Sequence, residues 1–342
     1  MRSRFALLRY RLALFFAVSI VTCHDAIAAE PYHPRPEVAA FIADVASRHG
    51  FDVESLAKLF RAARFEPRVI KAIMPPRDPG IRSWRAYRAR YIDADRIERG
   101  VRFWQANASA LRKAEANYGV PAQIIVAIIG VETIYGRHMG SFSTLSALTT
   151  LAFDYPPRAD LFRRELEELL LLAREKERSP LSFRGSYAGA IGIPQFLPSS
   201  YRQFGVDFDG DGRAELEGSV SDAIGSIGCF LRQHGWKANG SVTVRAKTDG
   251  DKHLALANGE VVPRFSRDDL DQHGVTSEQP IPEDEKSALI DLVTPHESTE
   301  FWLGFQNFYA LTRYNRSSFY AMAVFQLSEA LASACQGRCD RE

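Results

Sequence analysis

Hydrophobic residues recur at helical spacing along most of the chain, which predicts a mainly helical fold. The first such pattern begins at Pro36, places Val38, Ile42 and Val45 on one face, and ends near Gly50. Further helices with an apolar face are expected, in chain order, over residues 93–118, 121–135, 143–152, 158–177, 222–234 and 320–334.

The pattern changes between residues 240 and 298, where apolar and polar residues alternate. Such alternation is typical of half-buried strands. We therefore predict a small antiparallel sheet with strands around 242–246 and 288–292, and a further strand or extended segment over 299–308.

The first 28 residues have the features of a secretory signal peptide. They carry four arginines, then an apolar run over 12–21, and end in Ala-Ile-Ala. The run is shorter than the roughly 20 residues that span a bilayer, and no second candidate span follows. We expect an exported chain cleaved after Ala28. Lipid attachment at Cys23 fits less well, because Thr22 does not suit the position before a lipidated cysteine.

Four cysteines include one within the predicted signal peptide. Cys335 and Cys339 are close enough in sequence to form a disulfide in an oxidising compartment, and Cys229, in an apolar context, is expected to be a buried thiol. Three free thiols are the alternative, because spacing alone does not give the geometry that a disulfide needs.

Composition narrows the class of protein. The 43 basic and 42 acidic residues give a net charge of +1, so the chain lacks the overall positive charge typical of nucleic-acid binding. A hydrophobic share of 46% and a charged share of 25% exclude a disordered polymer and a protein with many membrane spans. The 342 residues suffice for two or three domains.

Glu132 stands out because it lies at the end of the most apolar predicted helix, 121–135. A carboxyl among apolar side chains loses hydration of its charged form, so its pKa should rise toward neutrality, as a general acid requires. The alternative is a structural glutamate that pairs with an arginine or caps backbone amides.

An Asp-rich segment resembles the start of a calcium loop. Asp207, Asp209 and Asp211 alternate before a glycine, as oxygen ligands do in such loops. The twelfth position is Gly218 instead of a bidentate glutamate, so the closing ligand would be Asp222, which is also predicted to cap its helix. The alternative is a solvated turn without metal.

The segment 185–205 is rich in glycine, proline and serine, which suits backbone that lines a groove. Its short hydroxyls and amide, at Ser186, Gln195, Ser199 and Ser200, suit sugar hydroxyl and N-acetyl groups, although each is also a common turn or cap residue. No Gly-x-Ser-x-Gly or His-Glu-x-x-His motif occurs, which argues against serine hydrolases and zinc proteases.

Together these segments closely resemble the membrane-bound lytic murein transglycosylase B family, and the resemblance covers about residues 41–331. The matching motifs occur in the same order as in the family, at residues 124–136, 185–192, 194–200, 222–226 and 313–323.

The resemblance implies an α+β fold that is predominantly helical, with a lysozyme-like core, an added helical domain and a small β domain. The expected divisions are 1–28 for the signal peptide, 29–118 for the helical domain, 119–239 for the catalytic core, 240–298 for the inserted β subdomain, and 299–342 for the return to the core and the C-terminal tail.

The resemblance also implies cleavage of the bond between N-acetylmuramic acid and N-acetylglucosamine in periplasmic peptidoglycan, by a monomer that needs no cofactor for the chemistry. Glu132 matches the family's catalytic acid and base. The groove would be lined by Ser186, Gln195, Tyr314, Asn315 and Tyr320, and a structural calcium ion would bind at Asp207, Asp209, Asp211 and Asp222.

Two departures from the family pattern are visible. Phe230 stands where a tyrosine is expected, which removes a hydroxyl near the groove, and the calcium loop is one residue longer before Asp222. A hydrolytic muramidase and a catalytically silent peptidoglycan-binding scaffold remain as alternative functions.

Overall fold

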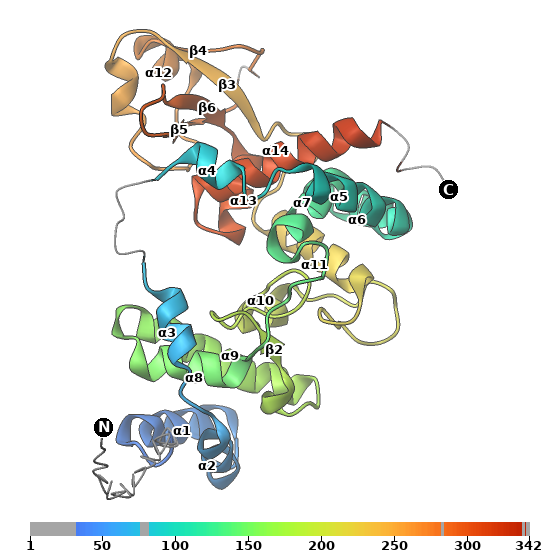
Figure 1. The fold of residues 1–342 in the computed structure, drawn as a ribbon, viewed down its shortest axis with the longest axis vertical. Helices are drawn as coiled ribbons and strands as arrows, with labels where there is room; N and C mark the ends of the chain where they lie inside the picture. Colours follow the sequence, from blue (N-terminus) through green and yellow to red (C-terminus); the bar gives the residue numbers. More distant parts are fainter. Residues whose placement is uncertain (1–31, 76–81, 282–283, 337–338, 340–342) are drawn as a thin grey trace, which may run out of the picture.

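The computed structural model describes residues 32–75, 82–281, 284–336 and 339, so the predicted signal peptide and Cys23 lie outside the described residues. Helices dominate the described chain (Figure 1), which confirms the predominantly helical prediction. They are α1 (Pro36–His49), α2 (Val53–Ala62), α3 (Pro67–Ile73), α4 (Trp84–Arg88), α5 (Ala94–Ala106), α6 (Ala108–Tyr118), α7 (Ala122–Thr133), α8 (Thr144–Asp154), α9 (Ala159–Glu175), α10 (Pro198–Phe204), α11 (Val220–Gln233), α12 (Arg267–Gln272), α13 (Gln306–Tyr314) and α14 (Ser318–Cys335).

Local signals explain most helix boundaries. Helix α1 begins at Pro36 and ends at Gly50, whose φ of 67° is the left-handed conformation that glycine tolerates. The predicted helix 93–118 is wrong in one respect, because Asn107 breaks it into α5 and α6. The side-chain amide of Asn107 donates to the carbonyl of Phe103, which gives the backbone a local alternative to a continuous helix.

The predicted sheet forms. It contains one strand, over residues 275–277, that the sequence did not predict. Four antiparallel strands lie in the order β4 (Val275–Ser277), β3 (Thr243–Thr248), β6 (Glu300–Gly304), β5 (Ala288–Leu292). The extended segment predicted over 299–308 is right for β6 and wrong beyond it, because α13 begins at Gln306. Two residues each make β1 (Phe142–Ser143) and β2 (Arg184–Gly185), which pair antiparallel.

Helix α7 is the centre of the core. Ten of its residues are buried, and it packs against α14, α5, α6 and α11. A helix that is apolar on nearly all sides is stable only when neighbours cover all of them. The most apolar predicted helix is therefore covered by neighbours on nearly all sides, and it carries Glu132 near its end.

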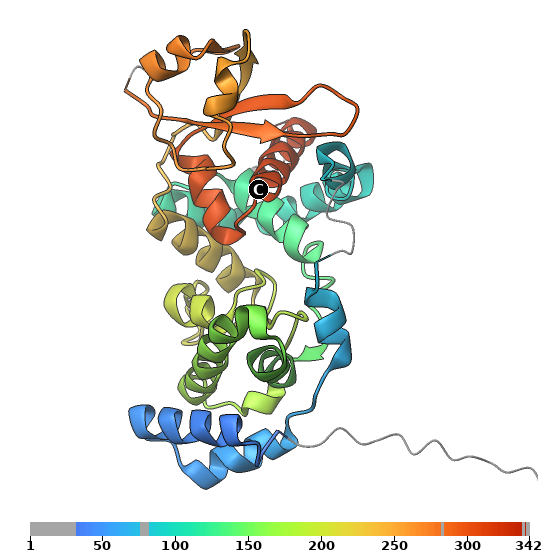
Figure 2. The same ribbon diagram turned by 90° about the vertical axis from the view of Figure 1, so that its left-hand side faces the viewer.

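The helices within residues 29–118 divide between two parts of the molecule. Helices α1, α2 and α3 lie near α8 and α9, whereas α4, α5 and α6 lie with α14, α7 and α11 (Figures 1 and 2). The four-stranded sheet forms the end opposite α1 and α2.

The cysteine predictions have different outcomes. Cys335 and Cys339 form the predicted disulfide. Cys229 is half-buried, so the prediction of a buried thiol is wrong; it lies on an incompletely covered side of α11, where the amide of Gln233 donates to its Sγ at 3.2 Å. No single described helix is long and apolar enough to cross a membrane. Helices α6 and α7 together have the length and composition of a membrane span, but they are bent by 114° where they meet.

Candidate active site

The turn after Glu132 has an unusual backbone. Ile134 and Tyr135 have φ values of 50° and 60°, a left-handed conformation that is uncommon for a β-branched residue such as isoleucine. Thr133 fixes this turn: its hydroxyl donates to the carbonyl of Ile193 at 3.0 Å and accepts from the Gly136 amide at 3.0 Å. The end of α7 is thereby joined to the glycine-rich segment.

Glu132 is half-buried and is held by one strong hydrogen bond. The hydroxyl of Tyr320, from α14, donates to Glu132 Oε1 at 2.7 Å. Burial raises the pKa of Glu132 to about 7, and the Tyr320 hydrogen bond opposes that rise. Near neutral pH the group can therefore both donate and accept a proton.

Tyrosines surround this carboxyl. The rings of Tyr314 and Tyr320 are stacked with centroids 6.3 Å apart. Burial, and next the negative charge of Glu132, raise the pKa of both hydroxyls well above the usual range. The pKa of Tyr87 on α4 is raised chiefly by burial, and the negative charge of Glu132 contributes to the rise. These hydroxyls stay protonated and act as hydrogen-bond donors.

Replacing Tyr320 with phenylalanine is expected to move the falling limb of the activity profile to higher pH. The hydrogen bond from Tyr320 favours the charged form of Glu132, so its loss raises the pKa of Glu132 further, and the acid stays protonated to higher pH. The measurement is kcat/KM against pH, with Tyr155→Phe, a half-buried tyrosine of another region, as control. An unchanged limb in Tyr320→Phe would contradict this prediction.

The structure places Ser186 and Gln195 beside the turn that follows Glu132. The side-chain amide of Gln195 donates to the carbonyls of Met139 and Gly192, at 3.0 and 2.9 Å. The Ser186 hydroxyl accepts from the amides of Ala188 and Ala190 and so shapes its own turn.

Two glycines mark where the backbones near this turn meet. A Cβ on Gly140 would lie 2.1 Å from the Gly185 carbonyl oxygen. A Cβ on Gly185 would lie 2.1 Å from the carbonyl oxygen of Ala190. The loop 136–140 and the segments 185–190 and 191–196 therefore form one wall.

Tyr314 is the last residue of α13, and Asn315 begins the turn that leads to α14. The Tyr314 hydroxyl donates to the carbonyl of Pro194 at 2.5 Å, which joins this turn to the same wall. Asn315 is exposed beside it. Ser199 of the predicted group is used structurally, because its amide and hydroxyl bind the buried carboxyl of Glu165.

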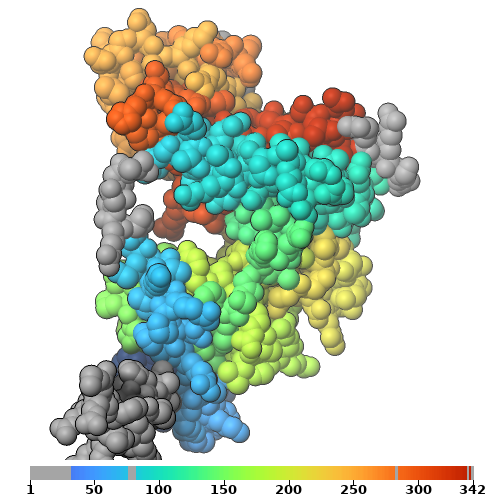
Figure 3. Space-filling model, viewed as in Figure 1, coloured from blue at the N-terminus to red at the C-terminus, as the bar shows by residue number. Residues whose placement is uncertain are grey.

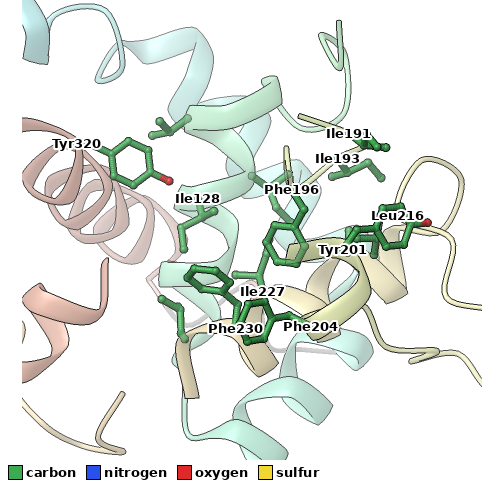
Figure 4. Packing of buried hydrophobic residues seen from close by; sticks show 14 of the residues in the cluster. Ile128, Ile191, Ile193, Phe196, Tyr201, Phe204, Leu216, Ile227, Phe230 and Tyr320 are labelled. Carbon is green, nitrogen blue, oxygen red and sulfur yellow. The ribbon is translucent and has the colours of Figure 1, made fainter. Parts of the chain in front are cut away.

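Phe230 is buried in an aromatic cluster. Its ring lies 4.9 Å from Tyr314, 5.5 Å from Phe196 and 4.0 Å from His234, measured between centroids. Figure 4 shows Phe230 between Phe204 and Ile128, with Tyr320 further along the same core. Phenylalanine at this position therefore packs well, and the hydroxyl that the family resemblance predicts is replaced by apolar contact.

The surface is hollowed on the face that Figure 3 shows. In Figure 3 the hollow lies between α3 and the part of the chain that contains α7, with α13 at its upper edge.

The predicted calcium ligands separate into two groups. Asp207, Asp209 and Asp211 are exposed, and they can each place a carboxylate oxygen within 4.8 Å of the others. Asp222 is fully buried and is not part of this cluster: its two oxygens accept from the amides of Phe208, Asp209 and Glu215. It is also not the N-cap of α11, because Ser219 is. Both of its carboxylate oxygens are therefore hydrogen-bonded to the backbone of the loop before α11.

Tyr87 and Thr133 are two site residues that the sequence did not point to. Tyr87 of α4 packs its ring against Phe319, the residue before Tyr320, at 5.6 Å between centroids, and its part of the chain shows no pattern beyond helical spacing. Thr133 follows Glu132 directly, so a hydroxyl beside a candidate acid was the available signal.

Comparison with known proteins defines the class. A family model described as "Transglycosylase SLT domain" matches residues 33–329. The membrane-bound lytic murein transglycosylase B of Escherichia coli (strain K12) is 41% identical over 310 residues, which cover 87% of this chain and 83% of that protein. The chain therefore belongs to the lytic murein transglycosylase B family.

Solved structures agree. Soluble lytic transglycosylase SltB1 from Pseudomonas aeruginosa is 44% identical, with a TM-score of 0.82 over 88% of this chain and 100% of that one. Escherichia coli Slt35 in complex with calcium is 39% identical, with a TM-score of 0.81 over 91% and 98% of the two chains. SltB3 from Pseudomonas aeruginosa, solved with NAG-anhNAM-pentapeptide, is 28% identical, with a TM-score of 0.74 over 86% and 78%.

Proposed function

We propose that this chain is a lytic transglycosylase that cleaves the bond between N-acetylmuramic acid and N-acetylglucosamine in peptidoglycan and leaves 1,6-anhydro ends. The observation that carries this proposal is Glu132, a single carboxyl with a pKa of about 7, fixed by Tyr320 at 2.7 Å. Ser186, Gln195, Tyr314 and Asn315 are proposed to line the glycan groove.

The mechanism uses Glu132 twice. Protonated Glu132 donates its proton to the glycosidic oxygen as that bond breaks, and the N-acetyl carbonyl of the muramyl sugar stabilises the positive charge at C1. The Glu132 carboxylate then takes the proton from the muramyl C6 hydroxyl, whose oxygen bonds to C1. Water is not added, and Glu132 ends protonated as it began.

A hydrolytic muramidase is the nearest alternative. Such an enzyme uses a second carboxylate as nucleophile or to activate a water molecule. Among the described residues the hydrogen bond to the Glu132 side chain comes from Tyr320, and we assign no second carboxyl to the site, which favours chemistry with one carboxyl. The anhydro sugar bound by the relative SltB3 supports the same choice.

Incubation of the purified chain with peptidoglycan sacculi tests this function against a binding scaffold. The proposal expects soluble muropeptides to be released from the sacculi over time. Sedimentation of the chain with sacculi, without any released muropeptide, would favour the scaffold. We also propose that the mature chain acts in the periplasm, where its substrate lies.

Calcium is proposed to bind at Asp207, Asp209 and Asp211. The fit is partial, since calcium takes six to eight oxygens and this cluster offers three carboxylates, with backbone carbonyls and water to complete the shell. The relative Slt35 was solved with calcium. When bound, the ion would rigidify the loop before α11, and no step of the chemistry needs it.

Added calcium is therefore expected to raise the Tm of the chain. At a free calcium concentration of 100 times Kd, the free energy of unfolding should rise by about 2.7 kcal/mol. Asp209→Ala removes one ligand and should abolish most of this rise. Asp160→Ala, at an exposed position of α9, is the matched control. A calcium-dependent rise that survives Asp209→Ala would contradict the assignment of this loop.

A further inference from the structure

A buried arginine contacts the end of the helix that carries Glu132. Arg96 lies on α5, which packs against α7 (Figure 1), and it is 9% exposed. Its Nη1 donates to the backbone carbonyl of Gly130, on α7, at 2.6 Å. Burying a guanidinium costs free energy unless its donors are bonded, so hydrogen bonds of this kind decide where the side chain lies.

The Gly130 carbonyl accepts this bond because α7 does not end as a regular helix. In a regular helix the amide of Ile134 would donate to Gly130, four residues earlier. Here that amide donates to the carbonyl of Ile129. Arg96 therefore takes the place of a backbone donor two residues before Glu132.

The same arginine is also bonded to the chain after Glu132. The Tyr135 hydroxyl donates to the backbone carbonyl of Arg96 at 2.9 Å. Each of the two helices has a glycine where this hydroxyl lies: a Cβ on Gly100 or Gly130 would come within 2.4 or 2.6 Å of its oxygen. Residues on both sides of Glu132 are thus tied to one residue of α5.

The guanidinium of Arg96 also reaches the loop between α4 and α5. Its Nη2 donates to the carbonyl of Arg90 at 3.2 Å, and the group lies over the Tyr91 ring, 5.4 Å from the centroid. Tyr91 in turn packs against Tyr87, with ring centroids 5.1 Å apart. One planar side chain therefore bonds two carbonyls from separate elements, whereas a lysine has a single nitrogen for both.

The backbone after Glu132 needs support of this kind. Ile134 and Tyr135 both have positive φ, and such strained residues persist only where the surrounding structure holds them. We propose that Arg96 is a positioning residue, which fixes the last turn of α7 so that the Glu132 carboxyl meets the Tyr320 hydroxyl in the orientation that proton transfer requires. The part of Glu132 in proton transfer rests on the proposed function.

The pKa of Glu132 tests this proposal without any substrate. The full chain is labelled with ¹³C at its glutamate carboxyls, and the Glu132 signal, identified by its loss in Glu132→Gln, is followed against pH by NMR. In wild type it should titrate at about 7. Arg96→Met should raise this pKa, because a displaced Glu132 loses part of the Tyr320 hydrogen bond that favours its charged form. The other two hydroxyls whose pKa reflects the charge of Glu132, on Tyr87 and Tyr314, are kept in this variant.

Two further variants separate position from charge, because Arg96→Met also removes a cation, which by itself raises the pKa of a nearby carboxyl. Tyr135→Phe keeps every charge and removes only the bond to the Arg96 carbonyl, so it should raise the pKa of Glu132 too. It also keeps the test open if Arg96→Met does not fold. In a Tyr320→Phe background, Arg96→Met should cause no further rise, because the hydrogen bond through which it acts is gone. A rise of equal size in that background would show a charge effect and overturn the proposal.

Activity on soluble peptidoglycan strands, measured well below the Tm of each variant, gives a second readout. Misplacing a catalytic group by about 1 Å can cost about 100-fold in rate, so Arg96→Met should lower kcat about 10-fold to 100-fold and change KM by less than about twofold. Arg96→Lys, which can still donate to the Gly130 carbonyl, should recover part of the lost kcat. Arg202→Met is the control: it removes ion pairs to Glu168 and Glu175, so it should lower the Tm and keep kcat.

The two readouts fail separately. An inactive wild-type chain would remove the proposed function, while the titration of Glu132 would still show whether Arg96 positions it. An unchanged pKa of Glu132 in both Arg96→Met and Tyr135→Phe, with only the Tm lowered, would make Arg96 a purely structural residue and overturn the proposal.

Discussion

Glu132→Gln is expected to slow the release of muropeptides from sacculi by about 10²-fold to 10⁴-fold, the usual contribution of general acid–base catalysis. Glutamine has the shape of glutamate but neither donates a proton to the glycosidic oxygen nor takes one from the C6 hydroxyl. The Tyr320 hydroxyl can still donate to the amide oxygen, so the fold around α7 should persist. The measurement is the initial rate of solubilisation by purified protein.

Glu165→Gln is the matched control for this experiment. Glu165 is a buried glutamate whose pKa is likewise raised by burial, but it lies on α9 and holds Ser199 at the start of α10. Its variant should keep near-normal activity below its Tm. Equal rates for Glu132→Gln and wild type would show that Glu132 is not the acid.

Asp222→Ala is expected to destabilise the fold by about 3 kcal/mol and to lower the Tm by about 6–12 °C. Asp222 is fully buried, and its carboxylate accepts from three backbone amides of the loop before α11. Removing it leaves those amides without an acceptor, and a buried unsatisfied donor costs about 1–3 kcal/mol. Thermal melting in a calcium-free buffer gives the shift.

Asp211→Ala tests the same loop at an exposed position. Its carboxylate accepts only from the Arg213 amide among the described residues, so its removal should change stability by less than about 0.5 kcal/mol. Equal losses for Asp222→Ala and Asp211→Ala in calcium-free buffer would contradict the structural role of Asp222.

The sequence pointed to Glu132 as the candidate acid but did not predict its surroundings. An isolated glutamate at the end of an apolar helix indicates a raised pKa, since its burial follows from the pattern. Its partner Tyr320 lies 188 residues away on α14, and no local pattern joins positions so far apart. Tyr320 was predicted only through resemblance to a family, and Tyr87 was missed entirely.

Other differences arise where side chains compete for the backbone. Asn107 divides a helix that periodicity alone makes continuous, because its amide bonds a carbonyl of the preceding turn. Asp222 was predicted to bind calcium because of its distance along the chain from Asp207. In the structure it is buried, and its carboxylate accepts hydrogen bonds from three backbone amides. The hydrogen-bond partners of such side chains depend on tertiary packing, and the spacing of residues along the sequence does not predict that packing.

The mass of the released muropeptides tests the central claim most directly. A single carboxyl that first gives and then takes a proton should yield muramyl ends lighter than ordinary reducing ends by one water molecule. Digestion of purified sacculi by the wild-type chain, followed by mass spectrometry, should find these anhydro ends. Hydrated reducing ends alone would contradict the account and show that water, not the C6 hydroxyl, attacks C1.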